Sequence, residues 1–74
     1  MINKIAEIRQ MKKLSQDKLA QKANITRPYL SDLENNKKKP SYEVANRIAK
    51  ALEKPMEEIF FDDNVNYNIQ NQSA

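Results

Sequence analysis

The chain has 74 residues, enough for one small domain, and it contains no Cys, His or Gly. Without thiolate and imidazole groups it lacks the side chains that most nucleophilic, general-base and transition-metal sites use, so we expect no enzyme, no metal and no other cofactor. The glycine-rich loops that cradle nucleotide phosphates are excluded as well.

The charge is unevenly distributed along the chain. Residues 1–54 carry all 13 basic side chains and six acidic ones, a net charge of +7, whereas the last twenty residues carry four acidic side chains. A segment with this positive net charge suits the binding of a polyanion such as nucleic acid. A chance distribution of charged residues on a solvated surface would give the same charge imbalance. The longest apolar run, Ile59–Phe61, is too short to span a membrane and no secretory signal is visible, so we expect a cytoplasmic protein without a membrane partner. No ligand pocket can be read from a chain this short, so we expect no small-molecule partner either.

Apolar residues at three-residue steps predict an amphipathic first helix over about residues 2–12. Its inward face carries Ile2, Ile5 and Ile8, with Met11 as a further candidate. We therefore expect this whole segment to pack as a helix against the core.

Two short helices follow and meet at a tight corner. Ser15 and Thr26 are typical N-cap residues, and they predict helices over about residues 16–23 and 27–35. Asn24 stands where a left-handed residue would end the first of these helices. A pair of helices with this spacing has the dimensions that the major groove of DNA admits.

A basic loop, Lys37–Lys39, leads to the last two predicted helices. Ser41 caps the fourth helix, and Pro55 opens a short fifth one that ends near residue 60. The inward positions of these two helices are Val44, Ala45, Ile48, Ala49, Leu52, Ile59 and Phe60.

The last residues, 62–74, form an acidic and polar tail that differs in composition from the rest. Val65, Tyr67 and Ile69 alternate strictly with polar residues. The tail is therefore either a disordered segment or a short strand that pairs with its twin in a dimer. Phe61, Val65 and Tyr67 are the candidate dimerisation residues.

Within the five predicted helices lies a set of spaced motifs. They are Leu14-Ser15-Gln16-x-x-Leu19-Ala20, Ile25-Thr26-Arg27-x-x-Leu30-Ser31-x-Leu33-Glu34-Asn35-Asn36-Lys37-x-x-Pro40-Ser41, Ile48-Ala49-x-Ala51-Leu52 and Glu57-Glu58-Ile59-Phe60. Over residues 2–60 this pattern closely resembles the lambda-repressor/Cro-type (XRE-like) helix-turn-helix family. The resemblance implies an all-α, compact five-helix DNA-binding domain over residues 1–61, followed by the polar tail.

The resemblance also implies which residues read bases. Arg27, Pro28, Ser31 and Asp32 stand where the family contacts base edges. Arg27 is the best candidate for guanine, whose O6 and N7 a guanidinium meets together, and Pro28 suits only a thymine methyl group. Asp32 is unusual, because phosphates repel a carboxylate; it would accept from a cytosine or adenine amino group, or pair with Arg27.

Other positions are expected at the phosphates or within the scaffold. Gln16 resembles the phosphate-binding Gln of the family, although it would also pass for an ordinary exposed residue. The remaining phosphate candidates are Tyr29, Asn35, Asn36, Lys37, Lys38 and Lys39; packing is the main alternative for the tyrosine, and a solvated loop for the lysines. Arg9 and Glu34 resemble a partly buried ion pair of the family, with two unrelated surface charges as the alternative.

The sequence departs from the family where relatives commonly carry Gly. The four positions hold Lys13, Asn24, Asn36 and Glu53. Asn tolerates a left-handed backbone well, whereas Lys and Glu adopt it at a cost of roughly 1 kcal/mol, unless these helices end in another way.

These observations predict a transcription regulator, a repressor that binds a palindromic operator in double-stranded DNA as a homodimer. The competing hypothesis is a protein-interaction module, antirepressor-like or antitoxin-like, that modulates another regulator. Its contact surface would include Met56, Phe61, Val65 and Tyr67.

Overall fold

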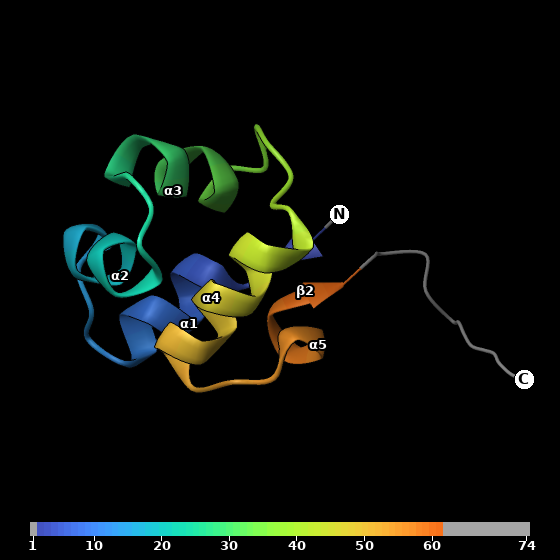
Figure 1. Cartoon of the computed structure of the whole chain (residues 1–74). Coiled ribbons are helices and arrows are strands. Elements are labelled where there is room, and N and C mark those ends of the chain that lie inside the picture. Colours follow the sequence, from blue (N-terminus) through green and yellow to red (C-terminus); the bar gives the residue numbers. More distant parts are fainter. Residues whose placement is uncertain (1, 62–74) are drawn as a thin grey trace, which may run out of the picture.

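The computed structural model describes residues 2–61, which form five helices and two very short strands (Figure 1). In chain order they are β1 (Ile2–Asn3), α1 (Ile5–Met11), α2 (Gln16–Ala23), α3 (Arg27–Glu34), α4 (Tyr42–Leu52), α5 (Met56–Ile59) and β2 (Phe60–Phe61). The predicted five-helix fold is confirmed. None of the helices in this part of the chain is long and apolar enough to cross a membrane.

Three hydroxyl groups set where the middle helices begin. Ser15, Thr26 and Ser41 are the N-cap residues of α2, α3 and α4, as their sequence positions predict. Each side chain accepts a hydrogen bond from the backbone N–H three residues further on, at 3.0 to 3.2 Å. These bonds satisfy donors that the first turn of a helix leaves free, so the short helices α2 and α3 start at defined residues.

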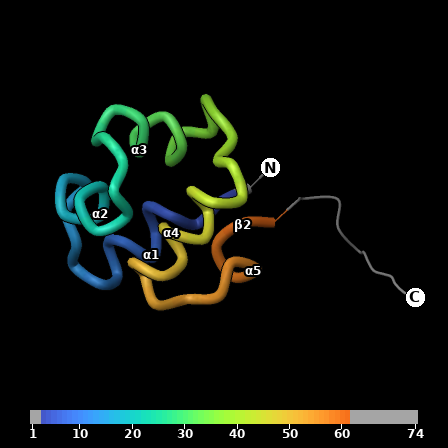
Figure 2. Tube along the Cα trace, viewed as in Figure 1, coloured from blue at the N-terminus to red at the C-terminus, as the bar shows by residue number. Residues whose placement is uncertain are grey.

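The first helix begins later than predicted, because β1 occupies its expected first turn. Ile2 and Asn3 pair antiparallel with Phe61 and Phe60, and the backbone N–H of Lys4 donates to the carbonyl of Ile59 at 2.8 Å. The Oδ1 atom of Asn3 accepts from the N–H of Ile5 at 3.1 Å, a local bond that competes with helix formation at residue 3. The two ends of the domain therefore lie side by side (Figure 2).

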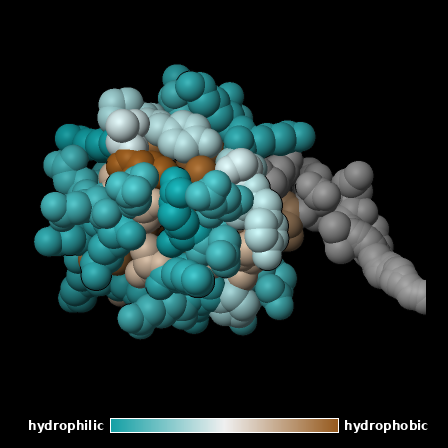
Figure 3. Space-filling model, in the orientation of Figure 1, coloured by the Kyte–Doolittle hydropathy of each residue, from teal (hydrophilic) through white to brown (hydrophobic). Residues whose placement is uncertain are grey.

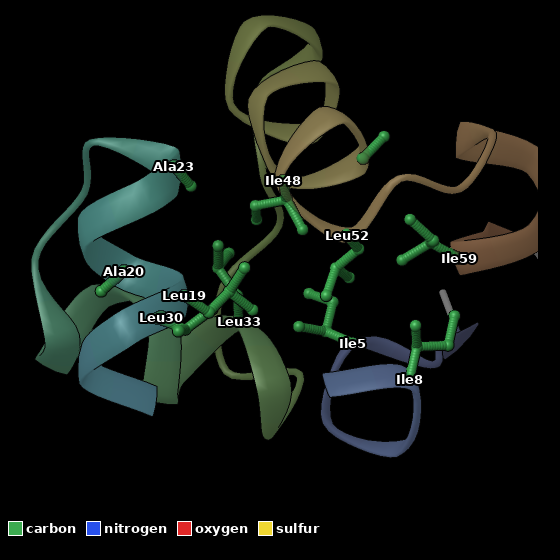
Figure 4. Close-up of a cluster of buried hydrophobic side chains, with 11 residues drawn as sticks. Ile5, Ile8, Leu19, Ala20, Ala23, Leu30, Leu33, Ile48, Leu52 and Ile59 are labelled. Carbon is green, nitrogen blue, oxygen red and sulfur yellow. The ribbon is translucent and has the colours of Figure 1, made fainter. Parts of the chain in front are cut away.

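All five helices contribute to one apolar core (Figure 4). Its largest fully buried side chains are Ile5, Leu19, Leu30, Leu33, Ile48, Leu52 and Ile59. Met11, a candidate for the inward face of α1, is 71% exposed, so that part of the prediction was wrong. It is the last residue of α1, and the chain turns away directly after it. The surface in Figure 3 is mostly hydrophilic, with hydrophobic residues visible only in small areas.

Four non-glycine residues have a left-handed backbone. They are Lys13, Asn24, Asn36 and Glu53, with φ between 59° and 61°. These are the four positions singled out in the sequence, and α2 and α4 each end on one of them. A lysine and a glutamate here store roughly 1 kcal/mol of unfavourable conformational energy each, which glycine would release.

We predict that Glu53→Gly raises the free energy of unfolding by about 1 kcal/mol, because φ of 59° suits glycine better than any residue with a Cβ atom. Glu53→Gln serves as the control that removes the charge and keeps the backbone preference. Thermal unfolding followed by circular dichroism measures both variants. An equal rise in both would assign the gain to charge and not to backbone conformation.

Candidate nucleic-acid interface

One face of α3 is turned away from the core. Leu30 and Leu33 are buried, whereas Arg27 and Pro28 are exposed. Ser31 and Asp32, one helical turn further on, are half-buried and follow the same face. The four predicted base-reading residues thus share one surface, and in Figure 1 helix α3 lies along an edge of the domain.

A chain of polar contacts runs from the interior to this surface. Arg9 Nε donates to Glu34 Oε2 at 2.8 Å, and only 13% and 6% of the two side chains are exposed, so the predicted buried ion pair is present. The other oxygen of Glu34 accepts from Gln16 Nε2 at 2.9 Å. Gln16 Oε1 in turn accepts from Arg27 Nε at 3.3 Å. Four side chains from α1, α2 and α3 are therefore linked in series.

Arg27 lies at the outer end of this series. Its second partner is Asp17, whose Oδ1 lies 3.7 Å from Nε. Both contacts use Nε, so the two Nη atoms are the ones left to reach a planar acceptor pair. The sequence offered an ion pair between Arg27 and Asp32 as one alternative, but in the structure the two residues have other partners.

Asp32 instead lies beside the basic loop. Its Oδ2 atom is 3.7 Å from Lys38 Nζ, and the same ammonium group lies 5.9 Å from the centre of the Tyr29 ring. Tyr29 is half-buried and packs against the core with its ring, as its packing alternative predicted. Lys38 is thus drawn toward α3, which lowers the local repulsion that the Asp32 carboxylate would exert on a phosphate.

The loop after α3 is held close to the helix end. The backbone N–H of Lys37 donates to the carbonyl of Asp32 at 2.8 Å. Asn35 uses its Nδ2 atom within the helix, on the carbonyl of Ser31 at 3.0 Å, whereas Asn36 accepts at Oδ1 from Asn3 Nδ2 at 2.8 Å. The loop lysines 37–39 are exposed.

The structure therefore brings the predicted DNA-contacting residues onto one continuous surface. This surface consists of Gln16, Arg27, Pro28, Ser31, Asp32, Asn35, Asn36, Lys37, Lys38 and Lys39, and it carries four cations and, with Asp17, two carboxylates. Tyr29 adjoins it through Lys38. Its positive charge and its helix with an exposed polar face fit a nucleic-acid backbone and groove.

Three residues near this surface were missed from the sequence. Asp17 partners Arg27, Asn3 reaches Asn36 across the domain, and Tyr42, at the start of α4, is 76% exposed next to the basic loop. An acidic residue in the first turn of a helix is favourable by itself, so Asp17 does not indicate a contact with Arg27, and nothing local to residue 3 signals a partner 33 positions away.

Phe61 is the one candidate dimerisation residue that the structure describes, and it is not among the residues of this surface. Phe61 is half-buried in β2, with Lys4 Nζ 5.8 Å from its ring centre. It lines a surface groove of about 450 Å³ between α1 and α5, which Met11 also borders. Val65 and Tyr67 lie outside the described residues.

The chain is similar in sequence to known helix-turn-helix proteins. The helix-turn-helix family matches residues 5–59. An immunity repressor protein of Bacillus phage phi105 is 43% identical over 49 residues, which are 66% of this chain and 34% of the repressor, so the chain aligns with about a third of that protein.

Two solved structures have a similar fold. The restriction-modification controller protein C.AhdI of Aeromonas hydrophila is 30% identical, with a TM-score of 0.74 over 77% of this chain and 86% of its own. The N-terminal DNA-binding domain of SinR from Bacillus subtilis is 26% identical, with a TM-score of 0.73 over 82% of this chain and 90% of its own.

We predict that Glu34→Ala lowers the free energy of unfolding by about 3 kcal/mol, because it leaves the buried Arg9 guanidinium without its partner. Replacing both partners, as Arg9→Met with Glu34→Leu, should lower it less, since no charge is then left buried. Urea denaturation measures all variants.

The matched control is Glu43→Ala, which breaks the exposed ion pair with Arg47 on α4. Its cost should stay below about 1 kcal/mol. Equal losses in Glu34→Ala and Glu43→Ala would contradict the assignment of Arg9 and Glu34 as a stabilising buried pair.

Proposed function

Because the chain belongs to the helix-turn-helix family of DNA-binding transcription regulators, we propose that it is a repressor that places α3 in the major groove of its operator. The observation that carries this proposal is the surface around α3. A rigid helix presents four side chains to one side, and the exposed lysines of the loop follow directly.

Arg27 is the residue that we propose to read sequence most strongly. Gln16 and Asp17 both contact its Nε atom, which leaves the two Nη atoms as donors for a planar acceptor pair. A guanidinium held in this way meets guanine O6 and N7 with little loss of side-chain entropy. Pro28 offers contact to a thymine methyl group, and Asp32 selects against bases that present an acceptor to it.

The loop and the start of α2 supply affinity without sequence preference. Lys37, Lys38 and Lys39 lie beside the helix end and neutralise phosphates, while Gln16 has a second N–H on Nε2 besides the one that Glu34 accepts. Release of counterions from the phosphates makes this part of the affinity strongly dependent on salt.

A homodimer completes the proposal. One recognition helix of eight residues touches too few base pairs for specificity, whereas two copies read a palindrome with half-sites about 34 Å apart. Phe61 and the groove beside it are the described surface that a second copy would cover. Repression follows when the bound dimer occludes a promoter.

We predict that Arg27→Ala lowers operator affinity by about 1 to 3 kcal/mol and removes the preference at one base pair of each half-site. Lys39→Ala should weaken binding to all sequences alike and reduce the slope of log K against log salt by about 1 for each protomer. Fluorescence anisotropy with labelled duplexes at several salt concentrations measures both effects.

Lys50→Ala is the control, because Lys50 is also exposed but lies near the opposite end of α4 from the basic loop. Its salt slope should equal that of the wild type. If Arg27→Ala together with Lys38→Ala leaves DNA binding unchanged, the surface around α3 does not bind DNA and the protein-interaction hypothesis takes its place.

For the dimer, we expect Phe61→Ser to shift sedimentation velocity profiles toward monomer, since it removes the large apolar side chain at the groove. Tyr42→Ser, which removes another exposed aromatic ring at the start of α4, is the control and should leave the profile unchanged. If Phe61→Ser keeps the wild-type sedimentation profile and the double variant Val65→Ser, Tyr67→Ser loses it, the dimer interface is formed by the tail and not by Phe61.

A further inference from the structure

Asn3 is bound to the end of α3, although it lies in β1. Its Nδ2 atom donates to the carbonyl of Leu33 at 2.9 Å and to Asn36 Oδ1 at 2.8 Å, while its Oδ1 atom accepts from the N–H of Ile5 at 3.1 Å. Its backbone is paired with Phe60 of β2. Both the side chain and the backbone of Asn3 are therefore fixed.

These partners allow only one orientation of two amide groups. The backbone N–H of Ile5 can only donate and the carbonyl of Leu33 can only accept, so Asn3 must turn its oxygen to the first and its nitrogen to the second. The nitrogen then also donates to Asn36, which must present its own oxygen. The remaining end of the Asn36 amide, its NH₂ group, is left as a donor on the side away from Asn3.

Asn36 is well placed to use that donor. It is exposed, has a left-handed backbone with φ of 61°, and stands between the end of α3 and the three loop lysines. Its backbone N–H is itself occupied by the carbonyl of Leu33 at 3.1 Å. The side-chain NH₂ is thus the group of this residue that can donate to a phosphate oxygen.

We propose that Asn3 is a positioning residue for DNA binding, which acts through Asn36 by turning the Asn36 NH₂ toward a phosphate. The inference depends on the proposed function, and it adds a residue outside the helix-turn-helix to the binding machinery. The relay has three steps: the N–H of Ile5 orients Asn3, Asn3 orients Asn36, and Asn36 donates to the phosphate. Because Asn3 also belongs to β1, the pairing of β1 with β2 holds this relay in place.

The relay is tested by a double-mutant cycle with Asn3→Ala, Asn36→Gly and the double variant. Glycine keeps the left-handed turn at position 36 and removes only the side chain. The probe is a short mixed-sequence DNA duplex, because a phosphate contact needs no particular base. Thermal unfolding confirms that each variant is folded at the assay temperature.

We expect Asn36→Gly to weaken duplex binding about tenfold and Asn3→Ala about fivefold, as loss of a hydrogen bond to a charged oxygen predicts. In the Asn36→Gly background, Asn3→Ala should have no further effect, because its only route to the DNA is gone. A purely structural role predicts the same loss in both backgrounds, and that result would overturn the proposal. So would an Asn3→Ala variant that binds like the wild type.

The variant Asn36→Asp provides an independent test that leaves the Asn3 side chain unchanged. The carboxylate still accepts from Asn3 but has no N–H for a phosphate, so stability should hold while duplex affinity falls by more than in Asn36→Gly. Wild-type affinity in Asn36→Asp would overturn the proposal.

Side-chain hydrogen exchange measured by NMR separates this inference from the proposed function, because it needs no DNA. The NH₂ protons of Asn3 should exchange more slowly than those of Asn36, and the reverse order would overturn the amide orientation. If the exchange rates follow the predicted order but the protein binds no duplex, the amide orientation stands. That result would overturn both the proposed function and the role of Asn36 at a phosphate.

Discussion

The carboxylate of Glu34 is the constraint on which the arrangement of the domain depends most. It is the last residue of α3, it is nearly buried, and it accepts from Arg9 of α1 and Gln16 of α2. Burying this charge is favourable only because both oxygens are paired, so the three helices cannot shift independently. Arg9 also donates to the carbonyl of Leu14, which holds the turn between α1 and α2. The position of α3, and with it the position of Arg27, depends on this buried charge together with the buried side chains of Leu30 and Leu33.

The lack of glycine shapes the rest of the domain. Four turns need a left-handed residue, and two asparagines, a lysine and a glutamate take that conformation. The hydroxyl caps of α2, α3 and α4 and the buried core contribute stability that offsets the cost at Lys13 and Glu53. The unfavourable conformational energy of these turns is therefore compensated by hydrogen bonds at the helix N-termini and by packing in the core.

The sequence predicts the helices well because their signals are local. Caps, apolar spacing and turn residues each involve a few neighbouring positions, and α2 and α3 begin where Ser15 and Thr26 indicate. The interface residues on α3 follow from the family resemblance and from the face opposite Leu30 and Leu33. Contacts between segments that are distant in the chain cannot be predicted from local patterns, because they depend on how the helices pack. Examples are the β1–β2 pairing, the hydrogen bond between Asn3 and Asn36, and the contact between Asp17 and Arg27. The tail residues Val65 and Tyr67 lie outside the described part and stay a prediction.

The outward face of α3 is the surface that we propose to read DNA sequence. Selection of duplexes from a random library by the purified protein, at physiological salt, tests this proposal most directly. If α3 reads the operator, the selected duplexes should be enriched in an inverted repeat whose half-site centres are about 34 Å apart, one turn of the double helix. Weak retention of every sequence without enrichment would contradict it, and would direct the search to a protein partner.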